Sequence, residues 1–450
     1  MTAAAAESEK ASVEPAEASA APEGVLAEPA GPVEAVEASA GSVEAPAARR
    51  RGTLLLILGA LSAIGPLSID MYLPALPAIA AEMDAGQSQV QLSLTACLIG
   101  VSAGQILAGP ISDVRGRRKP LLIGIAAYAV ASLLCAFSPG VYGLVGFRLL
   151  QGVAGGAALV IVRAVVRDLY QGAAIARIFA TLMLVSGLAP ILAPIAGAQL
   201  LAHTSWRGVF VSLSVAGLLL LAAALFGVRE TLPPGRREEG GLRHTLVTFW
   251  HLLRDRSFMS SALTGGLGFG AMFAYISASP FVVQEVYGAS PQTYSLLFAL
   301  NAFGLTVAAQ IGGRLAGRRV APSRLIVIGL VLFAAGAAVL MATALAHLPL
   351  PVLAAGLFVM MCGGGLVMPG AGALALAGQP QQVAGSASAL TGVLQFALGA
   401  VAAPLTGLAG GGALPMAAVL AVFALAALAA FTVLRRGASS VVPVDVVPAD

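Results

Sequence analysis

The sequence predicts an all-α integral membrane protein with twelve transmembrane helices in two pseudo-symmetric halves of six. Three observations support this fold class: the composition, a series of long apolar segments and the distribution of basic residues. Of the 450 residues, 58% are hydrophobic and only 10% are charged, and the mean hydropathy is +0.91. Soluble domains carry about 25% charged residues, whereas a lipid-facing surface needs almost none. We therefore expect the chain to lie in a lipid bilayer.

The apolar segments have the length that a helix needs to cross a bilayer. A hydrocarbon core of about 30 Å requires about 20 helical residues. The segments are continuously apolar and lack the alternation that is typical of a transmembrane β-barrel. The twelve expected spans lie near residues 53–78, 90–112, 119–138, 141–165, 174–201, 208–228, 258–282, 292–315, 323–346, 350–373, 384–409 and 412–434.

The basic residues between the spans predict the orientation. With the amino terminus inside, nearly all of them fall on the inner side, and Arg207 is the exception on the outer side. Because cytoplasmic loops are enriched in Lys and Arg, we expect both termini in the cytoplasm. The heavy use of Ala, Gly and Arg suggests a bacterial genome rich in GC, so the expected location is the inner (cytoplasmic) membrane of a bacterial cell.

The polar segments divide the chain into five expected parts. The first 48 residues hold nine glutamates, one lysine and no aromatic residue, a composition that cannot bury enough apolar surface to fold. Two related six-helix halves around a central cavity are typical of a transporter. The parts are a disordered acidic cytoplasmic tail (1–52), an N-terminal half (53–228), a central cytoplasmic loop (229–257), a C-terminal half (258–434) and a second cytoplasmic tail (435–450).

Several functions are disfavoured by what the sequence lacks. Its two lysines, Lys10 and Lys119, lie outside any G-x-x-x-x-G-K-[ST] loop, so ATP hydrolysis in this chain is not expected. The three cysteines are isolated in apolar segments, and the four histidines form no metal-ligand pattern. We expect no metal, no cofactor, no nucleic acid partner and no enzymatic activity, and we expect a proton gradient to supply the energy.

A loop rich in glycine and arginine follows the second expected span, with the sequence 109-GPISDVRGRRKPLL-122. Asp113 can pair with the arginines and face the start of a neighbouring helix, where a negative charge is favourable. The loop resembles the signature G-x-L-A-D-R-x-G-R-K-x-x-L of the major facilitator superfamily. The resemblance implies a latch that stabilises one conformation during alternating access. The loop departs from the signature at Val114 and matches it at Gly109, Asp113, Gly116, Arg117 and Arg118.

A cation lies in the fourth expected span. Arg148 would cost about 2.5–3.5 kcal/mol at the centre of a bilayer, so it either has a role inside the helix bundle or snorkels from near the helix end. Gln151, Gly152 and Gly156 follow on the same helical face, where the glycines allow close packing. The R-x-x-Q-G motif matches the family's fourth-helix signature. With the continuation 163-RAVVRD-168, the chain resembles the Bcr/CflA group of drug exporters.

Asp70 is the one acidic residue well inside an expected span. Its segment, 68-SIDMYLPALP-77, is similar to the first-helix pattern D-M-Y-L-P-A-L-P of the Bcr/CflA group. Burial favours the neutral carboxyl and a nearby Arg148 favours the ionised one, so the group can bind a proton in one state and release it in another. Asp70 and Arg148 are thus the expected residues of proton and substrate coupling. The alternative is a structural pair between them, or a helix end that is already hydrated.

Further segments extend the resemblance. Trp206-Arg207 and Phe210 match the start of the sixth helix, and 385-GSASALTGVLQ-395 matches the eleventh helix of the group. The fifth expected span loosely resembles the antiporter motif of exporters, in which prolines remove backbone donors and bend the helix. Its expected helix-bend residues are Gly187, Pro190, Pro194 and Gly197. Aromatic and amide side chains supply the expected substrate cavity, unless the aromatic ones face lipid: Tyr72, Gln151, Phe273, Tyr275, Asn301 and Gln395.

Together these features predict a proton-coupled secondary transporter that exports amphipathic small molecules, drugs among them, by rocking two halves around a midplane cavity. A proton-coupled importer of a sugar or organic acid is the alternative within transport, because only the fifth-helix motif indicates direction. A membrane sensor or membrane-embedded enzyme is a third interpretation, although no catalytic dyad is visible. The expected partners are a small-molecule substrate, protons and the lipid bilayer, and a monomer is expected to suffice.

Overall fold

The computed structural model describes residues 48–170, 173–233, 235, 242–316, 320–377, 379–380, 383–408 and 412–438. Most of the expected N-terminal tail and the end of the expected C-terminal tail lie outside the described residues. The described part is helical and contains 12 helices that are long and apolar enough to cross a membrane. The predicted all-α fold with twelve spans is thereby confirmed.

The observed spans begin and end within a few residues of the predicted ones. The first span consists of α1 (Ala48–Asp70), the 3-10 turn η1 (Leu73–Ala75) and α2 (Leu76–Glu82). The next five are α3 (Gln87–Arg115), α4 (Arg118–Ala136), α5 (Val141–Leu169), α6 (Ala173–His203) and α7 (Trp206–Gly227). The last six are α9 (Arg256–Phe281, extended by the π-turn η3, Val282–Val286), α10 (Pro291–Leu315), α11 (Pro322–Ala346), α12 (Leu350–Ala377), α13 (Ala384–Leu405) and α14 (Ala413–Ala438).

The central segment, predicted to be a loop, contains one further helix, α8 (Leu242–Arg254). Phe249, Leu252 and Leu253 recur at the spacing of a helical face, which a count of charges in this segment obscures. Phe249 and Leu252 pack in a cluster with Phe258 of α9. This packing gives a short amphipathic segment the tertiary support that a helix of its length needs.

The first span is broken directly after Asp70. Pro74 lies four residues further on and cannot donate a backbone hydrogen bond to the carbonyl of Asp70. The chain passes through η1, and α2 then starts with Pro77 in its first turn. Asp70 consequently sits at a helix end in the interior of the bundle.

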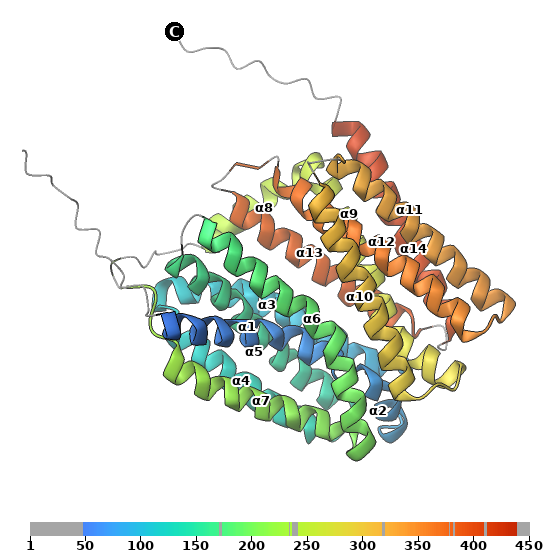
Figure 1. The fold of residues 1–450 in the computed structure, drawn as a ribbon, viewed down its shortest axis with the longest axis horizontal. Helices are drawn as coiled ribbons and strands as arrows, with labels where there is room; N and C mark the ends of the chain where they lie inside the picture. Colours follow the sequence, from blue (N-terminus) through green and yellow to red (C-terminus); the bar gives the residue numbers. More distant parts are fainter. Residues whose placement is uncertain are drawn as a thin grey trace, which may run out of the picture. The chain divides into compact units, whose positions relative to one another are not determined.

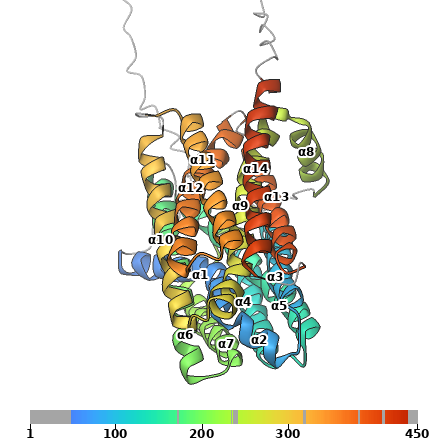
Figure 2. The same ribbon diagram turned by 90° about the vertical axis from the view of Figure 1, so that its right-hand side faces the viewer.

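The helices pack most extensively within the first six spans and within the last six. α3 packs on α5 and α4 on α7, while α11 packs on α12 and α9 on α13 and α14. The most extensive contacts between the two sets are those of α3 with α13 and of α6 with α10. Helices α6 and α10 run side by side in Figure 1. Figure 2 shows the helices of the second set lengthwise, with α10, α11, α12 and α14 running from top to bottom.

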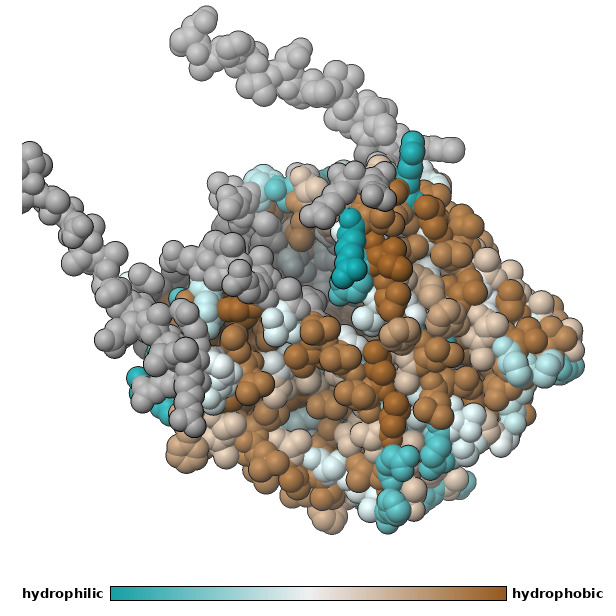
Figure 3. Space-filling model, viewed as in Figure 1, coloured by the Kyte–Doolittle hydropathy of each residue, from teal (hydrophilic) through white to brown (hydrophobic). Residues whose placement is uncertain are grey.

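The outer surface of the described helices is apolar. Figure 3 shows hydrophobic residues across the face that includes α6 and α10, with hydrophilic residues toward its edges. Leu184, Leu188 and Leu192 of α6 are exposed, as are Leu296 and Leu300 of α10. Such a surface matches lipid rather than water, and the chain is a multi-pass membrane protein.

Four glycines bring the backbones of α3 and α5 into contact. A methyl group at Gly104 would lie 2.1 Å from the carbonyl oxygen of Val153, and one at Gly156 would lie 2.2 Å from that of Val101. Gly100 and Gly152 are equally close to the opposite helix. The predicted role of the α5 glycines in close packing is confirmed, and the contact fixes two long helices as one rigid pair.

Replacing Gly156 with Ala should destabilise this pair, because the new methyl group meets backbone rather than a flexible side chain. We expect a loss of about 1–3 kcal/mol, which is typical of overpacking, and a lower thermal midpoint of the purified protein in detergent. Gly146→Ala on the same helix is the matched control, since nothing lies within 4 Å of its added methyl group. Equal midpoints for the two variants would contradict the close approach.

Candidate functional site

A cavity of about 260 Å³ lies between the two sets of six spans. One wall comes from the first set and contains Asp70, Pro66 and Pro190; the other comes from α9, α10, α12 and α13. Asp70 is 5% exposed and is the one ionisable carboxyl among the described lining residues. It forms no hydrogen bond or ion pair with the described part of the chain, so its carboxyl is available to a proton or a ligand.

Aromatic side chains form much of the wall that the second set contributes. Tyr275 stacks on Phe298 with a centroid distance of 5.6 Å and an interplanar angle of 14°. Phe269 lies 4.9 Å from Phe273 and meets Phe396 edge-on at 5.3 Å. Rings in this arrangement offer flat apolar faces and, through their negative π-faces, a site for a cation.

The predicted cavity residues fall into three groups: residues that line the cavity, one that supports a lining residue, and residues outside the described lining. Phe273 and Tyr275 line the cavity. Asn301 supports it indirectly, because its Nδ2 donates a hydrogen bond of 2.9 Å to the Tyr275 hydroxyl. The described lining does not include Tyr72, Gln151 or Gln395, and in the last case the neighbouring Phe396 takes the position. The type of side chain and the family resemblance suggested these residues, but neither shows which side chains border the cavity.

Arg148 is fully buried, which excludes the snorkelling alternative. Its Nη1 donates to the Ser68 carbonyl at 2.9 Å and to the Gln151 side chain at 2.5 Å, and its guanidinium lies 4.4 Å from the Tyr72 ring centre. The alternative of a structural pair between Arg148 and Asp70 does not hold in this conformation. No ion pair joins the two within the described residues, because Arg148 is enclosed beside Tyr72 whereas Asp70 borders the cavity.

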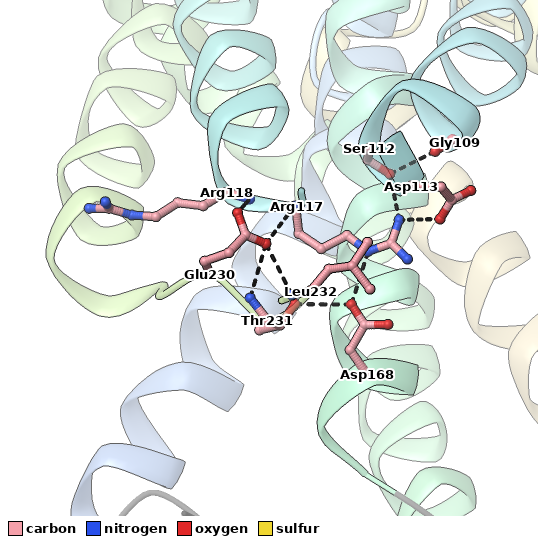
Figure 4. Close-up of polar contacts among 9 residues, drawn as sticks. All are labelled: Gly109, Ser112, Asp113, Arg117, Arg118, Asp168, Glu230, Thr231 and Leu232. Atoms are coloured by element: carbon pink, nitrogen blue, oxygen red, sulfur yellow. Dashed lines mark hydrogen bonds and ion pairs between the residues drawn. The ribbon is translucent and has the colours of Figure 1, made fainter. Parts of the chain in front are cut away.

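The predicted latch is a hydrogen-bonded network around Arg117, drawn in Figure 4. The Arg117 Nη1 lies 2.5 Å from Asp113 Oδ1 and 2.7 Å from Ser112 Oγ, and its Nε donates to Asp168 Oδ2 at 2.9 Å. The predicted pairing of Asp113 with an arginine is confirmed. Asp168 adds the end of α5 to the network, and the Thr231 hydroxyl donates to the same carboxylate at 3.0 Å.

Glu230 occupies the helix start that was expected to face Asp113. Its carboxylate accepts the backbone N–H groups of Arg117 at 2.7 Å and Arg118 at 3.2 Å, where α4 begins. Partial burial opposes ionisation, but four backbone N–H bonds outweigh it and hold the pKa of Glu230 below its usual range. The residue lies more than a hundred positions from the latch loop, so no spacing in the sequence pointed to it.

The remaining latch residues shape the turn and attach α7. Gly116 has φ +86°, in the left-handed region that favours glycine. The Arg118 side chain donates to the carbonyls of Val228 at 2.9 Å and Leu225 at 2.8 Å, so a cation lies at the end of α7. Gly109 contributes its carbonyl, which accepts from Ser112 at 2.8 Å. The network therefore ties together α3, α4, α5 and α7.

The two sets of spans are hydrogen-bonded to each other toward the opposite end, which we call the sealed end. Gln91, near the start of α3, donates to the Ser277 carbonyl and to the Thr406 hydroxyl, both at 3.0 Å. Gln284 donates to the Pro74 carbonyl at 3.2 Å. The Thr95 hydroxyl adds a hydrogen bond of 2.9 Å to the Ala400 carbonyl on the same side. The cavity is thus closed on the side away from the latch.

The predicted helix-bend residues lie along α6. Pro190 lines the cavity, and Pro194 follows one turn later inside the same helix. A methyl group at Gly197 would lie 1.8 Å from the Met71 carbonyl oxygen, so α6 contacts the chain directly after Asp70. Gly187 faces Thr306 of α10. These residues place α6 between the Asp70 break and the second set of spans.

Twelve spans around a cavity between two sets of six define a membrane transporter. The chain belongs to the Major Facilitator Superfamily, whose family model matches residues 58–404. It is 41% identical over 388 residues to the uncharacterized MFS-type transporter YdgK of Bacillus subtilis, covering 86% of this chain and 96% of the relative. It is 30% identical over 347 residues to a bicyclomycin resistance protein homolog of Haemophilus influenzae, covering 77% and 87%. This second match confirms the predicted resemblance to the Bcr/CflA group.

The fold recurs in solved transporters. A crystal structure of a D-xylose–proton symporter superimposes with a TM-score of 0.67 at 17% identity, covering 85% of this chain and 97% of the other. At that identity the likeness concerns the fold alone. The transport role rests on the family match rather than on this likeness.

Neutralising Glu230 should weaken the latch in a pH-dependent way. A carboxyl whose pKa is lower in the folded protein than in the unfolded chain stabilises the fold at pH values above its unfolded-state pKa. This contribution disappears as the pH falls through the pKa of the folded state. Since the side chain is exposed, we expect Glu230→Gln to cost only about 0.3–1 kcal/mol at neutral pH. The difference in thermal midpoint from the wild type should shrink below about pH 4, near the ordinary pKa of glutamate.

Asp84→Asn, which neutralises an exposed acid near the sealed end and outside the spans, is the control for this series and should show no such difference. A midpoint difference between wild type and Glu230→Gln that is constant from acid to neutral pH would contradict the assigned role.

Proposed function

We propose that this transporter exports amphipathic small molecules, foremost those that carry a positive charge, in exchange for protons. The observation that carries the proposal is the unpaired Asp70 carboxyl in a cavity with an aromatic wall. Such a cavity suits a flat apolar molecule with one cationic group. The bicyclomycin resistance name of one relative supports export of a drug.

Proton coupling follows from competition for one carboxyl. In an apolar cavity without substrate, an ionised Asp70 is poorly solvated, so the protonated form is favoured. A cationic substrate favours the carboxylate and releases the proton. One group that holds either a proton or a substrate links the two fluxes, and no further energy source is needed.

The proposed orientation places the latch end in the cytoplasm. Arg115, Arg117, Arg118 and Lys119 cluster there, as the positive-inside rule requires. The sealed end then faces outward, and the described conformation is closed to the outside. Export requires the hydrogen bonds of Gln91 to open while the two sets close over the latch end.

The cavity chemistry disfavours the importer alternative. A sugar presents many hydroxyl groups, each of which needs a polar partner when it is removed from water. The described lining offers the Asp70 carboxyl and the Tyr275 hydroxyl against a majority of apolar and aromatic residues. Such a lining matches an amphipathic molecule better than a sugar.

Asp70→Asn should uncouple transport from protons, because the amide keeps the shape of the side chain but cannot titrate. In energised inverted vesicles, cationic amphipathic dyes should trigger proton efflux with the wild type and none with the variant. Asp84→Asn is the matched control, since Asp84 is exposed and its left-handed conformation (φ 47°) suits asparagine. Undiminished dye-driven proton flux in Asp70→Asn, with normal expression, would refute the proposal.

Phe298→Ala should weaken the binding of aromatic substrates while leaving the proton chemistry intact. Loss of one stacking partner is worth about 0.5–1.5 kcal/mol, so the apparent KM should rise roughly 2- to 12-fold. Phe303→Ala on the same helix is the control, because Phe303 is 55% exposed on the outer surface. Equal KM values for the two variants, measured by dye uptake into inverted vesicles, would argue against an aromatic binding wall.

A further inference from the structure

Helix α8 is attached to the start of a membrane span. Asp255, directly after α8, accepts the backbone N–H groups of Ser257 at 2.9 Å and Phe258 at 3.3 Å and so caps α9. Its second oxygen accepts from Gln379 at 2.8 Å, which ties the junction to the segment before α13. Since α9 begins its membrane crossing at Arg256, the carboxyl end of α8 is held at the level of the bilayer surface.

The described apolar side chains of α8, which lie in its second half, are covered by protein on one side only. Leu252 is buried, and Phe249 packs beside it against residues of α9 and α13. Trp250 is 56% exposed and Leu253 is 42% exposed, although both are apolar. Figure 2 shows α8 at the periphery of the bundle, beyond α14. The half of the apolar face that includes Trp250 therefore has no cover within the described residues.

Cationic groups border this uncovered surface. The Arg254 guanidinium lies 4.5 Å from the centre of the Trp250 ring, and Arg256 is exposed two residues later. Tryptophan concentrates in the interfacial layer of membranes, and an amphipathic helix with basic residues beside its apolar face binds that layer. The Asp255 carboxylate binds the α9 cap and Gln379, and it forms no ion pair with either arginine within the described residues, so both guanidinium groups can reach lipid phosphates.

We infer that α8 is a membrane-surface helix that binds anionic phospholipids. Trp250 and Leu253 enter the interfacial layer, and the guanidinium groups of Arg254 and Arg256 contact the phosphates of anionic headgroups. Lipid is the occupant that the geometry favours over a protein partner, because the adjoining α9 span fixes this surface at bilayer level. The inference concerns a surface remote from the cavity and does not depend on the direction or substrate of transport.

The two tryptophans of the chain make a direct test possible. Trp206 is 2% exposed near the sealed end, so the difference between wild-type and Trp250→Phe emission reports Trp250 alone. We would reconstitute both proteins in phosphatidylcholine vesicles that contain an equal share of either brominated phosphatidylcholine or brominated phosphatidylglycerol. Bromine should quench Trp250, and the anionic lipid should quench more strongly, since one arginine contact corresponds to roughly fivefold local enrichment.

Arg254→Gln should reduce the preference for the anionic lipid, whereas Arg324→Gln, an exposed arginine at the start of α11, should leave it unchanged. If Trp250→Phe does not fold, Trp206→Phe leaves Trp250 as the single reporter. Quenching of Trp250 by aqueous iodide without quenching by bromolipid would overturn the inference. Protection from both quenchers would also overturn it and would assign the surface to protein. Equal quenching by the two lipids would refute the binding of anionic headgroups.

Discussion

The arrangement of this transporter depends on keeping one carboxyl group in an apolar cavity inside a membrane. Asp70 is placed there by a helix break: α1 ends at this residue, and Pro74 prevents the helical hydrogen bond that would continue it. α6 contacts the chain directly after the break through Gly197. An unpaired carboxyl in such surroundings is costly unless it binds a proton or a cation, and that requirement is the chemical basis of the exchange we propose.

Helix α3 extends from the contacts between the two sets of spans to the latch. Its start carries Gln91, which holds the two sets of spans together at the sealed end, and its end carries Asp113 of the latch. Backbone contact with α5 at Gly104 and Gly156 makes the helix part of a rigid unit. A rigid unit with a polar closure at one end and a charged network at the other suits a rocking motion, because the contacts between the sets can exchange without repacking either set.

The parts of the structure that could be predicted are those that depend on local sequence. Spans follow from length and hydrophobicity, and the Asp113–Arg117 pair follows from the short separation of the two residues across the turn at Gly116. Glu230 was missed because its contacts join segments far apart in sequence. Tyr72 was assigned to the cavity from the motif that contains it, which does not show where the side chain points, and it packs against Arg148 instead. Helix α8 was missed because its charges hid a short apolar periodicity.

The central claim is that a proton and a cationic substrate compete for Asp70. The most direct measurement is the number of protons released when a cationic dye binds the purified protein, obtained by calorimetry in buffers of different ionisation enthalpy. The account predicts about one proton released per bound dye below the pH at which Asp70 ionises, and none in Asp70→Asn. Binding with no proton release in the wild type, or equal release in both proteins, would contradict it.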